Sequence, residues 1–170
     1  MIQTALAAAL LVAQVSSPAA KPCLNRAEAA DLALLMLPGF IDGLAKTCGP
    51  RLPQTAFLRT GSGALAARIR SESAAGAPRG LAAFDKVGDE PMPPGVSAAT
   101  MRQLLDEIST SMADSMVKPA DCAAADEMIG ALSPLPAASL GKVVAVLMQL
   151  GTKSDGPGGG SGLRMCATTR

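Results

Sequence analysis

The sequence predicts an all-α fold, an irregular bundle of about six or seven short helices braced by two disulfides. Three observations support this prediction. Apolar residues recur at intervals of three and four, and no run alternates as a strand would. Alanine, the strongest helix former, supplies 33 of the 170 residues. The third observation is an even number of cysteines, four, in a chain that begins with the features of an export signal.

Residues 1–20 are predicted to be a signal peptide. They carry no charged side chain, and residues 5–15 form an apolar run that is too short to span a bilayer. Small residues at the end of the segment favour cleavage after Ala19 or Ala20. We therefore expect a periplasmic or secreted protein without a stable membrane span, in which residues 21–170 form a single helical domain.

Two helices are expected before the first proline-rich connector. Asn25 and Glu28 have the spacing of a capping box, which predicts a helix over residues 26–37. Pro38 should end this helix, because proline lacks the N–H group that a helix interior requires. A second, short helix is then expected over residues 39–47.

The next two helices are expected over residues 53–72 and 78–87. Proline is favoured at the first helical position, so Pro53 is a suitable start for the longer one. Gly61 and Gly63 weaken the middle of this helix, because glycine has a low helix propensity. A proline-rich loop follows the shorter helix.

Residues 98–117 form the clearest amphipathic segment, and Ser97 is a good N-cap for it. Its apolar stripe consists of Met101, Leu105, Ile108, Met112 and Met116. The three methionines could in principle bind cuprous ion. Without any histidine in the chain, we instead expect the stripe to face the core.

Two further helices complete the expected bundle. One begins at Pro119 or Asp121 and ends near residue 132, where a Ser-Pro-Leu-Pro sequence follows. The last spans residues 137–150, with Gly151 as its stop. A flexible, glycine-rich loop is expected over residues 152–162.

The cysteines are Cys23, Cys48, Cys122 and Cys166. Since no Cys-x-x-Cys pair and no histidine is present, they indicate two disulfides rather than a metal site, and three connectivities are possible. Nearest-neighbour pairing, Cys23 with Cys48 and Cys122 with Cys166, fits the expected helices best. It requires a chain reversal at Pro38, because a continuous helix would hold the first two cysteines about 35 Å apart. It also assumes that the last two long helices form an antiparallel hairpin.

Candidate catalytic groups are few, because the chain has no His, Trp or Tyr. Three acidic pairs, Asp89-Glu90, Asp106-Glu107 and Asp126-Glu127, could supply the acid and base of glycan hydrolysis. A hydrolase of this kind predicts a carboxylate with a raised pKa in a cleft, drawn from a small set of residues. The set is Glu28, Asp106, Glu107 and Glu127. Sugar sites usually have aromatic walls, so we favour solvated surface charges instead.

One hypothesis places an anion site on the helix predicted over residues 53–72. Arg59 and Arg70 are 11 residues apart, so on a continuous helix they would point within about 20° of each other. The favoured alternative is that the basic segment 51–79 packs against the acidic segment 81–130.

The sequence contains no motif that identifies an activity. A net charge of +1 argues against nucleic-acid binding, and nothing calls for a cofactor or a metal. We expect a non-catalytic binding or interaction module whose partner is another envelope protein or a small ligand. The alternative is a carboxylate-dependent hydrolase acting on cell-envelope glycan. A chaperone-like or inhibitory role would instead require a large exposed apolar patch.

Overall fold

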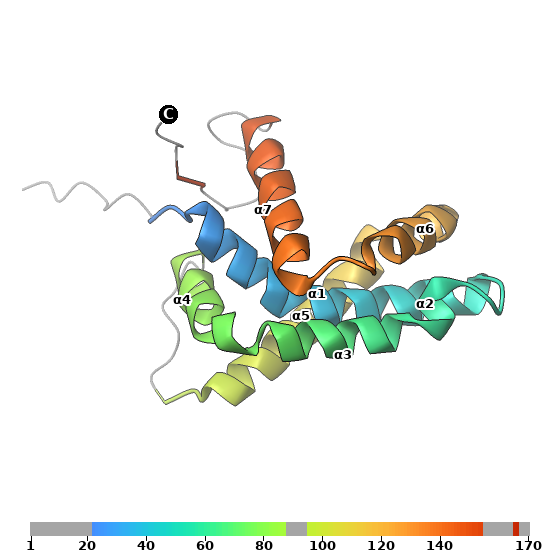
Figure 1. Cartoon of the computed structure of the whole chain (residues 1–170), viewed down its shortest axis with the longest axis horizontal. Helices are drawn as coiled ribbons and strands as arrows, with labels where there is room; N and C mark the ends of the chain where they lie inside the picture. The colour runs from blue at the N-terminus through green and yellow to red at the C-terminus, as the bar shows by residue number, and fades with distance from the viewer. Residues whose placement is uncertain (1–21, 88–94, 155–164, 167–170) are drawn as a thin grey trace, which may run out of the picture.

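The computed structural model describes residues 22–87, 95–154 and 165–166, and the regular elements in these ranges are all helical (Figure 1). The predicted all-α fold is confirmed. The α-helices are α1 (Arg26–Cys48), α2 (Phe57–Thr60), α3 (Ser62–Glu72), α4 (Ala77–Val87), α5 (Ala98–Met116), α6 (Cys122–Leu132) and α7 (Ala137–Ser154). Three 3-10 turns are η1 (Gly49–Arg51), η2 (Ala74–Gly76) and η3 (Pro119–Asp121). The predicted signal peptide lies outside the described residues.

Helix α1 is the centre of the fold. Helices α3, α4, α5 and α7 all pack along it, whereas α6 packs mainly against α2 (Figure 1). By length and composition the segment 26–51 could also cross a bilayer, but 56% of its most apolar window is buried inside the fold. Burial of this kind is typical of the core helix of a globular protein.

The prediction of two helices separated at Pro38 is wrong, because α1 continues from Arg26 to Cys48. Proline inside a helix costs about 3 kcal/mol. However, Leu34 and Ile41 on either side of Pro38 belong to one buried cluster, and burying a large aliphatic side chain contributes roughly 1.5–3 kcal/mol. Packing of both halves of α1 therefore outweighs the break.

The disulfides are Cys23–Cys166 and Cys48–Cys122, so two bridges are confirmed but the nearest-neighbour pairing is wrong. The continuous α1 explains the error, since its 23 residues hold its ends roughly 33 Å apart. Cys48 at the end of α1 meets Cys122 at the start of α6. Cys23 meets the C-terminal segment, where the Cys166 N–H donates to the Leu24 carbonyl at 2.8 Å.

Two other helix boundaries differ from the predictions. The helix expected over 53–72 begins at Phe57 and is divided at Gly61, whose backbone is not helical. Helix α7 continues through Gly151 to Ser154, so the expected stop is wrong, and the rest of the predicted loop lies outside the described residues. The hairpin of α6 and α7 is also absent from the described part, because α7 packs chiefly on α1.

The apolar stripe of α5 is buried only in its first half, which corrects the prediction that the whole stripe faces the core. Ile108, Met112 and Met116 are 36%, 40% and 64% exposed. The buried line of α5 consists instead of Met101, Leu105, Ser109 and Ala113. The predicted start of this helix and its Ser97 cap are confirmed, and the helix ends at Met116, one residue before the predicted end.

Candidate functional site

Helices α1 and α5 lie side by side and run in the same direction. The facing pairs are Gly39 with Asp106, Gly43 with Thr110, and Thr47 with Asp114. All three pairs share an offset of 67 residues, so the two helices stay in register over two turns. A Cβ atom on Gly39 or Gly43 would lie 2.6 Å from a backbone oxygen of α5. Only glycine permits this approach, and its Gly-x-x-x-Gly spacing is a signal that sequence analysis missed.

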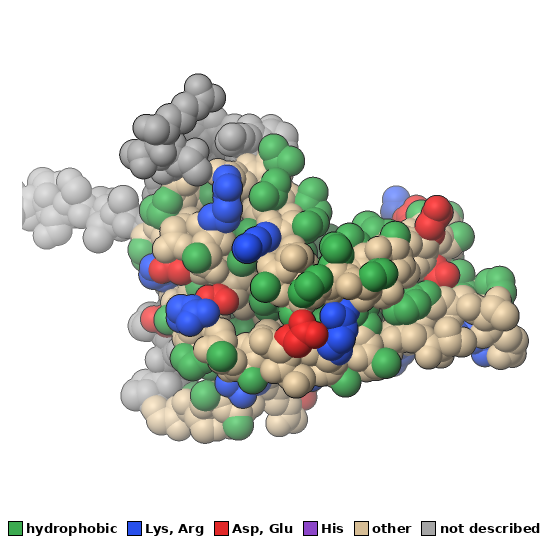
Figure 2. All heavy atoms as spheres, viewed as in Figure 1, with side chains coloured by type: hydrophobic (Ala, Val, Ile, Leu, Met, Phe, Trp, Pro, Cys, Tyr) green, Lys and Arg blue, Asp and Glu red, His purple; other side chains and the backbone are tan. Residues whose placement is uncertain are grey.

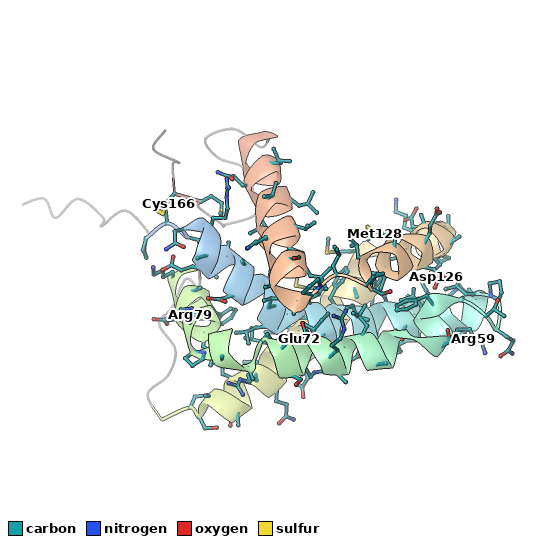
Figure 3. The ribbon with its side chains drawn as sticks, in the orientation of Figure 1. Arg59, Glu72, Arg79, Asp126, Met128 and Cys166 are labelled. Carbon is teal, nitrogen blue, oxygen red and sulfur yellow. A yellow bond between two sulfur atoms is a disulfide. The ribbon has the colours of Figure 1, made fainter. Side chains whose placement is uncertain are left out.

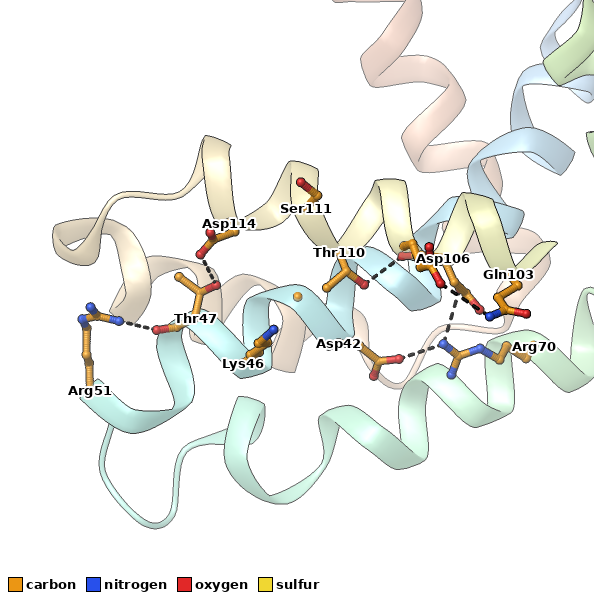
Figure 4. A pocket seen from close by; sticks show the side chains of 12 residues that line it. Asp42, Lys46, Thr47, Arg51, Arg70, Gln103, Asp106, Thr110, Ser111 and Asp114 are labelled. Carbon is orange, nitrogen blue, oxygen red and sulfur yellow. Dashed lines mark hydrogen bonds and ion pairs between the residues drawn. The ribbon is translucent and has the colours of Figure 1, made fainter. Parts of the chain in front are cut away.

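A polar groove runs along this contact, between α1, α5 and α3 (Figure 4). Its volume of about 660 Å³ lies within the range of small-molecule sites, about 300–1,000 Å³. Apart from the buried Gly43, every residue that lines the groove is polar or charged. The groove is therefore suited to a small polar ligand rather than an apolar one.

An ion cluster closes one end of the groove. The Arg70 guanidinium of α3 donates to the Asp42 carboxylate of α1 at 2.7 Å and to the Asp106 carboxylate of α5 at 3.4 Å. Partial burial opposes the charge on Arg70, but the two carboxylates outweigh it and raise the pKa of Arg70. Arg70 thus links three helices and is held in its charged form.

The other end of the groove is closed by Thr47, Arg51 and Asp114. The Thr47 hydroxyl donates to the Asp114 carboxylate at 2.9 Å, which joins α1 to α5. The Arg51 guanidinium donates to the carbonyl of Thr47 (Figure 4). This end lies directly before the Cys48–Cys122 bridge, so its position is fixed covalently.

Lys46 and Glu107 line the groove on the inner side of these ends, with Glu107 next to Asp106 in sequence and Lys46 next to Thr47. Figure 4 shows Lys46 on α1 between Asp42 and the Thr47–Asp114 pair. Within the described ranges, the hydrogen bonds and ion pairs include none to the Lys46 ammonium. Glu107 on α5 accepts one long hydrogen bond, 3.5 Å, from Gln103. Both charged groups can therefore engage a ligand without losing a strong internal partner.

The two arginines predicted to form an anion site have separate partners. Arg59 lies on α2 and donates to the carbonyls of Gly49 and Leu52 (Figure 3). It does not line the groove to which Arg70 contributes. Division of the helix at Gly61 removes the angular relation on which the prediction depended.

The favoured alternative was that the basic segment 51–79 packs against the acidic segment 81–130. One ion pair, between Arg70 and Asp106, joins these two segments. A second contact joins the same two segments, because the backbone N–H of Leu58 donates to the Asp126 carboxylate at 2.7 Å.

The acidic residues considered for hydrolysis are dispersed. Asp106 and Glu107 line the groove, whereas Glu127 is exposed on α6. Glu28 accepts a hydrogen bond from Lys86, and this contact together with the backbone N–H of Asn25 lowers the pKa of Glu28. The raised pKa that the hydrolase hypothesis requires is therefore contradicted for Glu28. The pair Asp89-Glu90 lies outside the described residues.

Two continuous apolar stripes are exposed elsewhere. The α5 stripe consists of Leu104, Ile108, Met112 and Met116. The α7 stripe consists of Val143, Val146, Leu147 and Leu150. Their side chains are 36–64% exposed, and each set has the spacing of one helix face. Hydrophobic side chains gather over α7 and α6 in Figure 2, and Figure 3 labels one of those on α6, Met128.

No family model, curated protein or solved structure matches the chain. Functional inference therefore depends on the groove and the two stripes. Every cysteine in the described ranges belongs to a disulfide. These ranges also contain no cluster of three or more cysteine or acidic residues that could hold a metal ion.

Proposed function

We propose that this chain is an exported, non-catalytic interaction module that binds the apolar face of an amphipathic helix in a partner protein of the cell envelope. The observation that carries the proposal is the pair of exposed stripes on α5 and α7. Eight large apolar side chains, each at least 36% exposed, are arranged at helical spacing. Partner helices dock on apolar grooves and faces through this same spacing.

The chemistry of the stripes supports a helical partner. Neither stripe contains a charged residue, so no ion has to be desolvated when a partner covers it. Met112 and Met116 have flexible, polarisable side chains that can adapt to different apolar surfaces. The α5 stripe runs from Leu104 to Met116, a rise of roughly 18 Å that can contact several turns of a partner helix.

Export is supported by the disulfides and the N-terminal composition. Two disulfides among the described cysteines suit an oxidising compartment. Thiol titration of protein recovered from intact cells tests this part of the proposal. We expect no reactive thiol, and four reactive thiols would contradict export.

The binding test uses a synthetic amphipathic helix with a Leu face and a Lys face as the probe. We expect the double variant M116D/L147D to bind this peptide about tenfold or more weakly than the wild type, because a carboxylate would be buried in an apolar contact. E127Q, on an exposed position of α6, is the matched control and should bind as the wild type does. Equal affinity of the double variant and the wild type would contradict the proposal.

The hydrolase alternative predicts turnover of cell-wall glycan. This chemistry needs a pair of available carboxyl groups, whereas in the groove Asp42 and Asp106 are engaged by Arg70. Asp114 is engaged by Thr47, which leaves Glu107 without a second available carboxyl group. We therefore expect no turnover of purified peptidoglycan. Turnover that is lost in the variant E107Q would support the alternative and overturn the non-catalytic proposal.

A further inference from the structure

The groove has an uneven distribution of charge along its length. The end at α3 combines the carboxylates of Asp42, Asp106 and Glu107 with one cation, Arg70. The end at η1 combines Lys46 and Arg51 with one carboxylate, Asp114. On α5, Glu107 and Asp114 are two helical turns apart, which corresponds to about 10 Å. The groove is therefore negative at one end and positive at the other.

We propose that this groove binds a small zwitterion with an ammonium and a carboxylate, an amino acid or a short peptide. The ammonium would lie at the end of Glu107 and Asp42, and the carboxylate would lie near Lys46. A charge-assisted hydrogen bond is stronger than a neutral one, so each end contributes both affinity and orientation. This site is separate from the apolar stripes and does not depend on the proposed partner protein.

Lys46 and Glu107 are the residues that select the ligand. Arg70 is already shared by Asp42 and Asp106, and Thr47 is engaged with Asp114, so these groups frame the site. Lys46 and Glu107 can turn to a ligand without breaking a strong internal contact. Ligands that carry only ammonium groups or only carboxylates satisfy just one of the two, which predicts weak binding of amines without a carboxylate and of carboxylates without an amine.

The net charge of the groove refines the ligand class. Four carboxylates and three cations line it, which leaves one negative charge in excess. A basic amino acid carries two ammonium-type groups and one carboxylate, so its net charge is complementary. An acidic amino acid has a net negative charge, like the groove, and is repelled. We therefore expect the affinity for lysine to exceed that for glutamate.

Isothermal titration calorimetry with full-length protein tests the proposal. The probes are L-lysine, the dipeptide Lys-Ala, L-glutamate, putrescine as an amine without carboxylate, and acetate. We expect lysine or Lys-Ala to bind at least tenfold more tightly than putrescine and acetate. The tighter of these two ligands distinguishes a free amino acid from a peptide. Binding of none of the probes would overturn the proposal.

Three variants locate the site. K46Q and E107Q should each weaken zwitterion binding about tenfold, whereas K142Q, on an exposed position of α7 outside the groove, should leave it unchanged. K46Q should leave the weak binding of putrescine unaltered, which a general loss of folding would not. Equal loss with K142Q, or binding that is unaffected by K46Q and E107Q, would overturn the proposal. The variant M116D/L147D should retain zwitterion binding, so failure here is distinguishable from failure of the partner-binding proposal.

Discussion

The two flanks of α5 have opposite chemistry although they belong to one helix. On the groove flank the residues are polar, namely Gln103, Asp106, Glu107, Thr110 and Asp114. On the other flank they are large and apolar, namely Leu104, Ile108, Met112 and Met116. The buried line of α5 runs between these flanks, and α1 contacts both this line, at Ala113, and the groove flank, at Asp106 and Thr110. The large apolar stripe of a helix therefore need not be the stripe that faces the core.

The close approach of α1 explains why small residues, Ser109 and Ala113, occupy the second half of the buried line of α5. A Cβ atom on Gly43 would already lie 2.7 Å from the Cβ of Ala113. Ser109 is 1% exposed and donates to the Leu105 carbonyl at 2.6 Å, so its hydroxyl needs no outside partner. A larger side chain at either position would separate the helices, since cores do not tolerate overpacking. Met112 and Met116 remain outside.

The largest effect on stability is expected from removing the Cys48–Cys122 bridge, which fixes the end of α1 beside the groove. The double variant C48A/C122A should lower the free energy of unfolding by about 4 kcal/mol, because the bridge joins residues 74 apart in sequence. Urea denaturation measures the change. A loss below about 1 kcal/mol would show that this end of the bundle is held by packing alone.

Alanine substitution of two adjacent leucines compares the buried line of α5 with its apolar flank directly. Leu105 is fully buried, whereas Leu104 is 45% exposed. L105A should cost about 3 kcal/mol through lost burial and a cavity, and L104A less than about 1 kcal/mol. Chemical denaturation of both variants tests this, and similar costs would mean that α5 is rotated from the orientation described.

Glycine substitutions test the close contact between α1 and α5. G43A places a methyl group against the backbone of α5 and should cost about 2 kcal/mol. Gly63 in α3 has nothing within 4 Å of its added Cβ, so G63A should be neutral or stabilising by up to about 1 kcal/mol. Thermal unfolding monitored by circular dichroism compares the two. An equal response would contradict the parallel contact of α1 and α5.

The smallest effect is expected at Glu28, which is remote from both flanks. Its pKa is lowered in the folded protein, so its carboxylate stabilises the fold above the unfolded value, about 4.3, and this contribution is lost as the pH falls through the folded value. E28Q should cost about 1 kcal/mol or less at neutral pH and converge with the wild type in acid. Denaturation as a function of pH measures it. A difference that persists in acid would indicate packing rather than charge.

Local signals in the sequence were sufficient for most helix boundaries. The predicted capping box of Asn25 and Glu28 is present, and Ser97 accepts a hydrogen bond from the N–H of Thr100 at the start of α5. These features depend on residues three apart, so they act before any tertiary contact forms. The groove was only partly foreseen. Asp106, Glu107 and Arg70 were considered, but for other roles, and Lys46 was not considered.

What the sequence alone determined was the helical class, the caps and the presence of two bridges, because helical period, capping and cysteine parity are local or compositional properties. Only the tertiary structure decided the path of α1 through Pro38, the pairing of the cysteines and the buried line of α5. Each of these is a competition between a local cost and contacts that are distant in sequence. Burial on both sides of Pro38 outweighs one missing hydrogen bond, and the two glycines of α1 determine which side chains of α5 are excluded from the core.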